Sequence, residues 1–273
     1  MALQNLVAIS FAFALLLSNP MLTKSQEVED EREFSYVTGT ENGPEHWGEI
    51  HKEWSECGKG EMQSPIDLHH QRVQVLDYLG PLTRKYQPAD AVMVNRGHDI
   101  SVKWEEGAAG GILLNGTEYF LRQLHWHAPS EHSINGVRYS LELHMVHQSA
   151  DKKIAVVGIM YKIGRPDPLL AKMEHYITML KDAEGEEEKL GMIDPEDVKW
   201  GSRKYYRYMG SLTTPPCTEG VMWTIIKKVR TVSREQIHLL REAVHDESQM
   251  NARPKQEIND RVIGLYRPRK VRY

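Results

Sequence analysis

Apolar and polar residues alternate along most of the chain, which leaves few folds open to it. The alternating runs are short and are separated by glycine, asparagine and proline, as is typical of antiparallel strands joined by turns. Such runs are Ala91–Asn95, Ile100–Trp104, Tyr119–His127, Val137–Val146, Ile154–Lys162 and Val221–Val229. Two other stretches, Pro168–Ala183 and Ser233–His245, have helical periodicity, and the second begins with a capping-box pattern. The sequence therefore predicts one β-rich α+β domain, with a large, mainly antiparallel twisted sheet and a few peripheral helices.

The N-terminal 25 residues do not follow this pattern. Leu6–Ser18 is an uncharged apolar run that ends at Asn19 and Pro20. A helix needs about 20 apolar residues to cross a bilayer, so the shorter run predicts a signal peptide at residues 1–25 and no membrane anchor. A buried N-terminal helix is the alternative, but the run has no polar face. We expect a soluble protein that enters the secretory pathway.

The rest of the chain has no internal repeat and no linker that would divide it. We expect an acidic lead-in at residues 26–33, one domain at residues 34–268 and a basic tail at residues 269–273. Glu184–Glu188 is predicted to be a short acidic loop. The net charge of -4 provides no large positive field, which makes nucleic acid an unsuitable partner.

Secretion affects the interpretation of the two cysteines, Cys57 and Cys217. In an oxidising compartment an even pair favours a disulfide bond, and two buried thiols are the alternative. The sequon Asn115-Gly116-Thr117 lies next to a predicted turn, so a glycan on Asn115 would be exposed.

Three histidines on two neighbouring predicted strands indicate a metal site. His125 and His127 share one face of the first strand because side chains two residues apart point the same way, and His144 lies on the second strand. The turn-forming pair Asn135-Gly136 between the strands would let them pair antiparallel and bring the three imidazoles to one point. Three imidazoles with an open fourth position form a catalytic zinc site, so we expect Zn²⁺ as the cofactor.

Two polar side chains share the faces of these histidines. Gln123 precedes His125 by two residues and Glu142 precedes His144 by two, where each would accept a hydrogen bond and fix a ring tautomer. The remaining histidines, His132 and His147 among them, are expected to lack such partners, and His147 is expected to point to the opposite face from His144.

The cupins, a β fold that binds Mn or Fe, offer a rival interpretation. His125, His127 and Glu131 fit the cupin pattern H-x-H-x3-E. However, Arg138 stands where that pattern expects a glycine, and no later P-x-G-x-x-H element supplies the last ligand. Three neutral imidazoles also suit zinc better than Mn or Fe, which disfavours the cupin interpretation.

Several separated motifs, in a fixed order, carry a resemblance to a known family. They are Asn42–Trp47, Gln63–Asp67, Asn95–His98, His125–His132, Glu142–His147, Ser211–Cys217 and Asn251–Pro254. Together they resemble an α-class carbonic anhydrase over residues 34 to 268. The segment H-W-H-x-P-S-E-H resembles the plant branch of that family, with its nectarin-like and dioscorin-like members.

The resemblance implies a zinc enzyme that reversibly hydrates carbon dioxide to bicarbonate and a proton by means of a zinc-bound hydroxide. The three histidines of the two strands would hold zinc. Thr213 would accept a hydrogen bond from the hydroxide and donate its own proton to Glu131. His98 would carry the released proton out through water.

A substrate pocket and a tethered loop are also implied. The apolar wall that holds carbon dioxide would be formed by Val146, Val156, Leu212, Val221 and Trp223. Thr214 would contact bicarbonate, and the Cys57–Cys217 disulfide of secreted members would tether the loop 213–216. One X-Pro bond in that loop is cis in this family.

Three positions depart from the family pattern or leave a choice open. Ala128 follows His127 where animal members commonly have tryptophan. Arg96 lies near His98, where its charge would disfavour the imidazolium and slow proton export. The N-terminal aromatic near the site is either Phe34 or Tyr36.

A second class of function stays open, because some plant relatives resemble storage or defence proteins. Members that have lost the site usually replace a zinc-binding histidine, and this chain retains all three. Catalysis on carbon dioxide is therefore favoured over storage. The apoplast is the favoured destination, and the vacuole and the chloroplast also fit a signal peptide.

Overall fold

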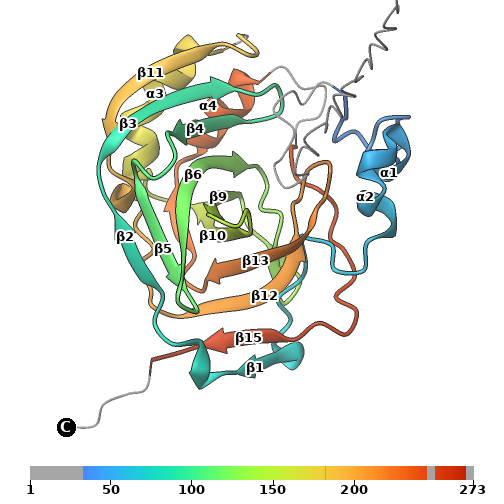
Figure 1. Cartoon of the computed structure of the whole chain (residues 1–273). Helices are drawn as coiled ribbons and strands as arrows, with labels where there is room; N and C mark the ends of the chain where they lie inside the picture. The colour runs from blue at the N-terminus through green and yellow to red at the C-terminus, as the bar shows by residue number, and fades with distance from the viewer. Residues whose placement is uncertain (1–32, 182, 245–249, 269–273) are drawn as a thin grey trace, which may run out of the picture.

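The computed structural model describes residues 33–181, 183–244 and 250–268. The predicted signal peptide, residues 26–32 of the lead-in and the basic tail lie outside these residues. The largest element is a sheet of 13 strands that curls around itself (Figure 1). Its main path runs in the order β1 (Val73–Val75), β15 (Ile263–Tyr266), β12 (Tyr205–Ser211), β13 (Glu219–Ile226), β10 (Ile154–Ile163), β9 (Leu141–Ser149), β6 (Thr117–His127), β4 (Ile100–Trp104), β3 (Ala89–Asn95) and β11 (Glu187–Ile193).

The remaining elements are shorter or peripheral. Strands β2 (Thr83–Tyr86), β5 (Gly110–Leu114) and β14 (Arg230–Val232) pair off the main path, and β7 (Ser133–Ile134) with β8 (Val137–Arg138) forms a separate hairpin. The helices are α1 (Trp47–Ile50), α2 (Glu56–Lys59), α3 (Pro168–Met179) and α4 (Arg234–Ala243), with 3₁₀ turns at Lys52–Trp54, His70–Arg72, Asp77–Leu79 and Pro195–Asp197. The predicted β-rich fold is confirmed.

Most strand pairs are antiparallel, as predicted. The pairs β1·β15, β10·β13 and β10·β14 are parallel, so the sheet is mixed. Alternation along a single strand does not encode the direction of its neighbour, and the sequence therefore did not distinguish these pairs from the antiparallel ones.

Both predicted helices form, and their starts agree with the sequence. Asp167 caps α3 by accepting hydrogen bonds from the N–H groups of Leu169 and Leu170, and α3 ends at Met179, earlier than predicted. The capping box of α4 is present, with Ser233 and Gln236 bonded reciprocally.

Two predicted boundaries are wrong because contacts distant in sequence override the local pattern. The run Val137–Val146 is divided between β8 and β9, since Tyr139 exchanges hydrogen bonds with Ser130 instead of a neighbouring strand. The predicted acidic loop overlaps β11, in which Glu187 pairs with Val94 of β3.

Alternation along β6 and β9 separates two layers of side chains. Leu124, Trp126, Leu143 and Met145 belong to the larger core, which also contains the apolar faces of α3 and α4. Val146 belongs to a second apolar cluster with residues of β10, β12 and β13. The three histidines of β6 and β9 that point away from the larger core therefore lie on the face of the sheet opposite α3 and α4.

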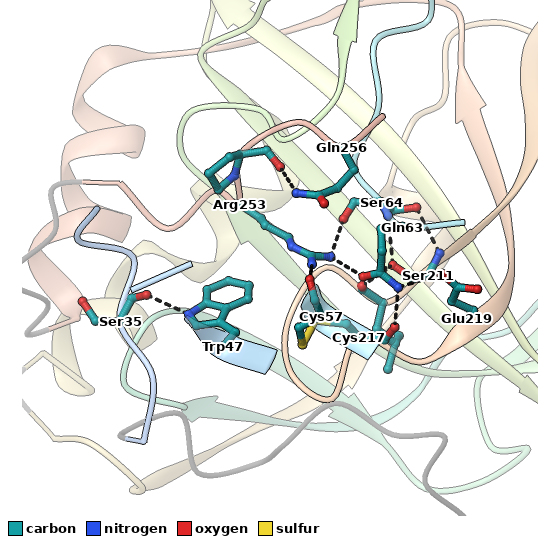
Figure 2. Close-up of a disulfide and its surroundings, with 12 residues drawn as sticks. Ser35, Trp47, Cys57, Gln63, Ser64, Ser211, Cys217, Glu219, Arg253 and Gln256 are labelled. Atoms are coloured by element: carbon teal, nitrogen blue, oxygen red, sulfur yellow. Dashed lines mark hydrogen bonds between the residues drawn. A yellow bond between two sulfur atoms is a disulfide. The ribbon is translucent and has the colours of Figure 1, made fainter. Parts of the chain in front are cut away.

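The predicted disulfide between Cys57 and Cys217 is formed, and a buried arginine lies beside it (Figure 2). Arg253 is 1% exposed and donates to the carbonyl oxygens of Cys57 and Ser64 and to Gln63 Oε1, each at 2.8 Å. Its guanidinium also lies 5.6 Å from the ring centre of Trp47. Burial lowers the Arg253 pKa to about 10, so the group stays charged at neutral pH. Arg253 thus links its own segment to three others, which contain Trp47, Cys57 and the residues 63–64.

Two further expectations agree with the structure: the exposure of Asn115 and a cis X-Pro bond in the loop 213–216. Asn115 lies in the exposed turn between β5 and β6 with φ of 50°, a position accessible to a glycan. Among the described residues, no helix has the length and apolar character that crossing a membrane requires. The Pro215–Pro216 bond is cis, as the resemblance implied.

His147 lies on the opposite face from His144, as predicted, but it does have partners. Tyr86 Oη lies 2.7 Å from His147 Nε2, and His147 Nδ1 donates to the carbonyl of Ala155 at 3.1 Å. Burial lowers the His147 pKa to about 4. The ring is therefore neutral in the folded protein throughout the physiological range.

This burial predicts a pH dependence of stability. An unfolded histidine has a pKa of about 6.5, so the unfolded chain binds a proton that the folded chain rejects between that pH and about 4. Acidification through this window should destabilise the fold. We expect the free energy of unfolding, measured by urea denaturation at a series of pH values, to fall more steeply on acidification than it does in His147→Gln. The two slopes should differ by up to about 1.4 kcal/mol per pH unit. Parallel slopes for the two proteins would contradict the assignment.

Candidate metal centre

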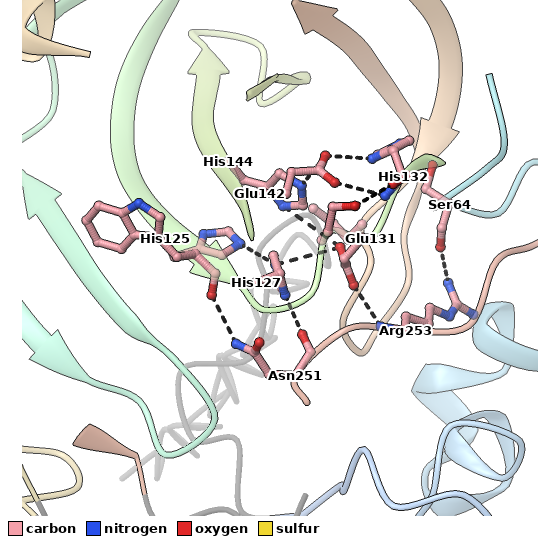
Figure 3. Close-up of polar contacts among 12 residues, drawn as sticks. Ser64, His125, His127, Glu131, His132, Glu142, His144, Asn251 and Arg253 are labelled. Atoms are coloured by element: carbon pink, nitrogen blue, oxygen red, sulfur yellow. Dashed lines mark hydrogen bonds and ion pairs between the residues drawn. The ribbon is translucent and has the colours of Figure 1, made fainter. Parts of the chain in front are cut away.

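Antiparallel pairing of β6 with β9 brings the three predicted histidines together. His125 lies directly opposite His144 in this pairing, and His127 is two residues along the same face. The ring centres are 4.6–5.2 Å apart, and the side chains are at most 1% exposed. One nitrogen from each ring lies within 4.8 Å of the other two (Figure 3). The predicted convergence is confirmed.

Hydrogen bonds determine which nitrogens of His125 and His127 are available. His125 Nδ1 donates to Gln123 Oε1 at 2.8 Å, and His127 Nδ1 donates to the carbonyl of Asn251 at 2.6 Å. In the neutral rings both Nε2 atoms then carry only lone pairs, although they lie 3.0 Å apart. Two lone pairs at this distance repel unless a cation lies between them. The residues present therefore fit a metal ion.

The third ring is oriented by a chain of buried hydrogen bonds. His144 Nε2 donates to Glu142 Oε1 at 3.0 Å, which leaves Nδ1 as the available nitrogen. His132 Nδ1 donates to the same oxygen at 2.7 Å, while His132 Nε2 accepts from Tyr208 Oη at 2.6 Å, and Ser64 Oγ lies 2.8 Å from that hydroxyl. The expectation that His132 lacks partners is thus wrong.

The cluster of His132, Glu142 and His144 could also be read as a second metal site. However, Glu142 already accepts hydrogen bonds from both rings and from the His132 N–H, so it acts as the shared acceptor. His132 was missed because its partners come from β9 and β12, which the sequence does not bring together. Its position directly after Glu131, in a motif that carries the resemblance, was the available signal.

Burial and charge set the protonation of this cluster. Burial holds the pKa of His125 well below its usual value and lowers that of His144 to about 4. Burial opposes the charge of Glu142, but His132 and His144 together keep its pKa well below the usual range. At His125 and His144 the site therefore has neutral imidazoles, which are the form that binds metal, and the charged Glu142 carboxylate lies behind them.

Glu131 is fully buried next to the histidines. Its Oε1 accepts the backbone N–H of Arg253 at 2.9 Å. Its Oε2 lies 3.7 Å from His127 Nε2 and 3.9 Å from His144 Nδ1, and it has no hydrogen-bond partner among the described residues. The predicted hydrogen bond from Thr213 to Glu131 is thus not formed at either oxygen.

The two threonines of the loop 213–216 are each 1% exposed. Within the described part of the chain, Thr214 Oγ1 is buried and has no hydrogen-bond partner. Buried polar atoms without partners are rare in folded proteins and mark places where water, an ion or a ligand completes the bonding. Thr214 and Glu131 both have such atoms.

The predicted apolar wall gathers on the same face of the sheet. Val146, Val156, Leu212, Val221 and Trp223 belong to one buried cluster. The Trp223 ring lies 4.8 Å from the ring of His144, and its Nε1 donates to the carbonyl of Ser211. The structure therefore places an apolar surface directly beside the metal centre.

His98 is 9% exposed, and both candidate aromatics contact it. Its Nε2 donates to the carbonyl of Phe34 at 2.7 Å, while the rings of Phe34 and Tyr36 lie 5.0 and 5.4 Å from its ring. The choice between these two aromatics thus has no single answer, because each packs against His98.

Arg96 does not act alone on His98. Its Nε donates to Asp99 Oδ1 at 2.7 Å, and its Nη2 pairs with the other carboxylate oxygen. Burial would raise the Asp99 pKa, but Arg96 counteracts this and the pKa is about 2. Because Asp99 is charged and adjacent, it offsets the effect that Arg96 was predicted to have.

The family model described as eukaryotic-type carbonic anhydrase matches residues 42–267. The chain belongs to this family. It is 54% identical over 262 residues to "Alpha carbonic anhydrase 7" of Arabidopsis thaliana, covering 96% of this chain and 95% of that protein. It is 49% identical over 261 residues to "Carbonic anhydrase Nec1" of Nesocodon mauritianus, covering 94% of each.

A solved structure of dioscorin complexed with ascorbate has the same fold. Its TM-score is 0.84 at 44% sequence identity, covering 88% of this chain and 100% of that one. The predicted resemblance to the plant branch of the α-class carbonic anhydrases, with nectarin-like and dioscorin-like members, is confirmed.

Proposed function

We propose that this protein is a zinc enzyme that reversibly hydrates carbon dioxide to bicarbonate and a proton. Membership of the carbonic anhydrase family supports the reaction. The observation that carries the proposal is the convergence of three imidazole nitrogens whose partner nitrogens are all engaged as hydrogen-bond donors. This arrangement is a three-histidine site of the kind that binds catalytic zinc.

Zinc in such a site lowers the pKa of bound water from 15.7 to about 7, the established value for carbonic anhydrase, and so supplies a nucleophile at neutral pH. The chain's contribution is to orient the ligands. Gln123 and the Asn251 carbonyl fix the tautomers of His125 and His127, and charged Glu142 makes His144 a stronger ligand.

Glu131 and Thr213 would orient the attacking water. The Arg253 N–H holds one Glu131 oxygen, and the unpartnered Oε2 is the acceptor that a Thr213 hydroxyl proton requires. Once Thr213 donates there, its oxygen can only accept, which directs a lone pair of the water toward carbon dioxide. The adjacent apolar wall suits a linear, uncharged substrate and favours release of the charged product.

Each turnover also releases a proton. We assign its export to His98, since imidazole is the side chain whose unperturbed pKa is best matched to accepting and releasing protons near neutral pH. His98 packs against Phe34 and is 9% exposed, so the proposed route to solvent would leave through this small exposed part.

Thr213→Ala tests the orientation step. We expect kcat/KM for carbon dioxide hydration to fall about 100-fold, since removing one positioned hydrogen-bonding group typically costs 10²–10³. Zinc content should stay near one equivalent, because Thr213 is not a ligand. Thr213→Ser keeps the hydroxyl and should retain most activity. A stopped-flow rate for Thr213→Ala within twofold of the unmodified protein would exclude this role.

A storage or defence role is the second candidate, because dioscorin is among the relatives. Metal analysis and stopped-flow hydration, with and without a sulfonamide, separate the two. An enzyme should contain about one zinc and lose its activity with the inhibitor. Less than about half an equivalent of zinc under non-chelating conditions, without hydration, would leave only the non-enzymatic role.

We also propose that the protein is secreted, with signal cleavage near residue 25 and a glycan on Asn115. The disulfide and the exposed turn at Asn115 support this. N-terminal sequencing of protein expressed in plant cells, and a mobility shift after glycosidase treatment, test both points.

A further inference from the structure

Asn251 uses all of its polar groups to hold the end of β6. Its N–H donates to the carbonyl of Ala128 at 3.3 Å, and its Oδ1 accepts the Ala128 N–H at 2.8 Å. Its Nδ2 donates to the carbonyl of Trp126 at 3.0 Å. Asn251 therefore grips the backbone on both sides of His127.

Asn251 also contacts two residues with proposed roles, of which His127 is labelled in Figure 3. Its carbonyl accepts His127 Nδ1 at 2.6 Å, and its Nδ2 donates to the carbonyl of His98 at 2.9 Å. One carboxamide nitrogen thus bonds both to the strand that bears a proposed zinc ligand and to the proposed proton carrier.

The turn 95–99, which contains His98, is held together by its own hydrogen bonds and an ion pair. The Arg96 N–H donates to the Asp99 carbonyl at 2.9 Å, and the buried ion pair of these residues closes the turn a second time. Within it, the Gly97 N–H donates to Asn95 Oδ1 at 3.0 Å, and Gly97 has φ of 103°, which suits glycine. A bond to the His98 carbonyl therefore places the whole turn, and the imidazole with it.

We propose that Asn251 is a positioning residue that sets the separation between His98 and the metal centre through its shared Nδ2 donor. This inference rests on the proposed role of His98 in proton export. Transfer steps are sensitive to displacements of about 1 Å, so a loosened turn slows proton export. The hydration step itself depends on the histidine ligands and is affected much less.

Asn251→Asp is the sharpest variant. It keeps the Oδ1 acceptor for Ala128 and the backbone carbonyl for His127, and it removes only the Nδ2 donor. Because it adds a charge, it is studied together with His98→Ala and the double variant in a double-mutant cycle. Asn251→Ala, which adds no charge, provides the second test.

The measurement is stopped-flow hydration by the zinc-loaded full chain at low buffer concentration. Either Asn251 variant should lower kcat about tenfold or more, as loss of a positioned acid–base group does, and should lower kcat/KM by a smaller factor, because the backbone carbonyl that orients His127 is retained. Added imidazole buffer should restore kcat. In the His98→Ala background, the substitution at Asn251 should cause no further fall in kcat.

A second measurement does not depend on activity. The His98 ring signal in the NMR spectrum of either Asn251 variant should shift, while that of exposed His175 and the zinc content should not change. An unshifted His98 signal, an unchanged kcat, or an equal fall in kcat with and without His98 would overturn the inference. If His98→Ala itself leaves kcat unaltered, the proposed proton carrier is wrong. If kcat falls in His98→Ala but is unchanged in the Asn251 variants, the proton carrier is correct and only the positioning role of Asn251 is wrong.

Discussion

Replacing His144 with alanine should lower carbon dioxide hydration more than about 100-fold, since the loss of even an outer partner of a metal ligand costs 10–100-fold. Two imidazoles would remain of the three that converge. The substitution would also remove one of the two rings that keep the Glu142 carboxylate charged. Zinc content by metal analysis and stopped-flow rates should fall together.

His175→Ala is the matched control, because this histidine is exposed on α3 and takes no part in the cluster. It should keep full zinc content and activity. Circular dichroism would verify that His144→Ala retains the fold, which the remaining core supports. Full activity in folded His144→Ala would show that the ligand assignment is incorrect.

Arg253→Ala should reduce the free energy of unfolding by roughly 3 kcal/mol or more. The guanidinium is the donor for three buried oxygens, and each acceptor left without a donor costs roughly 1–3 kcal/mol. Part of this cost is offset because the variant no longer has to desolvate a buried positive charge. A loss of this size corresponds to roughly 6–12 °C in Tm for a domain of this length, measured by calorimetry.

Two variants distinguish this network from a general effect of removing arginine. Arg165 is exposed, so Arg165→Ala should change stability by less than about 0.5 kcal/mol. Arg253→Lys keeps the charge but has no planar fork, and it should lose an intermediate amount. If Arg253→Ala melts at the same temperature as Arg165→Ala, the buried hydrogen bonds contribute nothing measurable.

The metal centre was predictable from sequence because its main determinants are local. His125 and His127 share a face through the two-residue period of a strand, and Gln123 follows the same rule. Only the pairing with His144 required a step beyond one strand, and the turn residues between the strands indicated it. The capping box of α4 was predictable for the same reason.

Contacts distant in sequence were not predictable in this way. His132 and Tyr208 come from separate segments of the chain. Arg253 donates a hydrogen bond to the carbonyl of the disulfide cysteine Cys57, which lies far away in the sequence. The start of β11 looked like an acidic loop because its pairing with β3 has no local signal. Asp99 was overlooked as the partner of Arg96, although both lie in one turn, since the charge pattern alone does not show burial.

The sequence by itself determined the β-rich fold class, the three histidines that converge and the resemblance to a family. These follow from periodicity and from the order of short motifs, which a linear chain carries in full. Only the tertiary structure decided which nitrogen of each imidazole is available, how Glu142 is shared, and how Asn251 joins His98 to β6. Hydrogen bonds depend on distance and direction in space, and folding brings together donors and acceptors whose separation along the chain gives no indication of their contact.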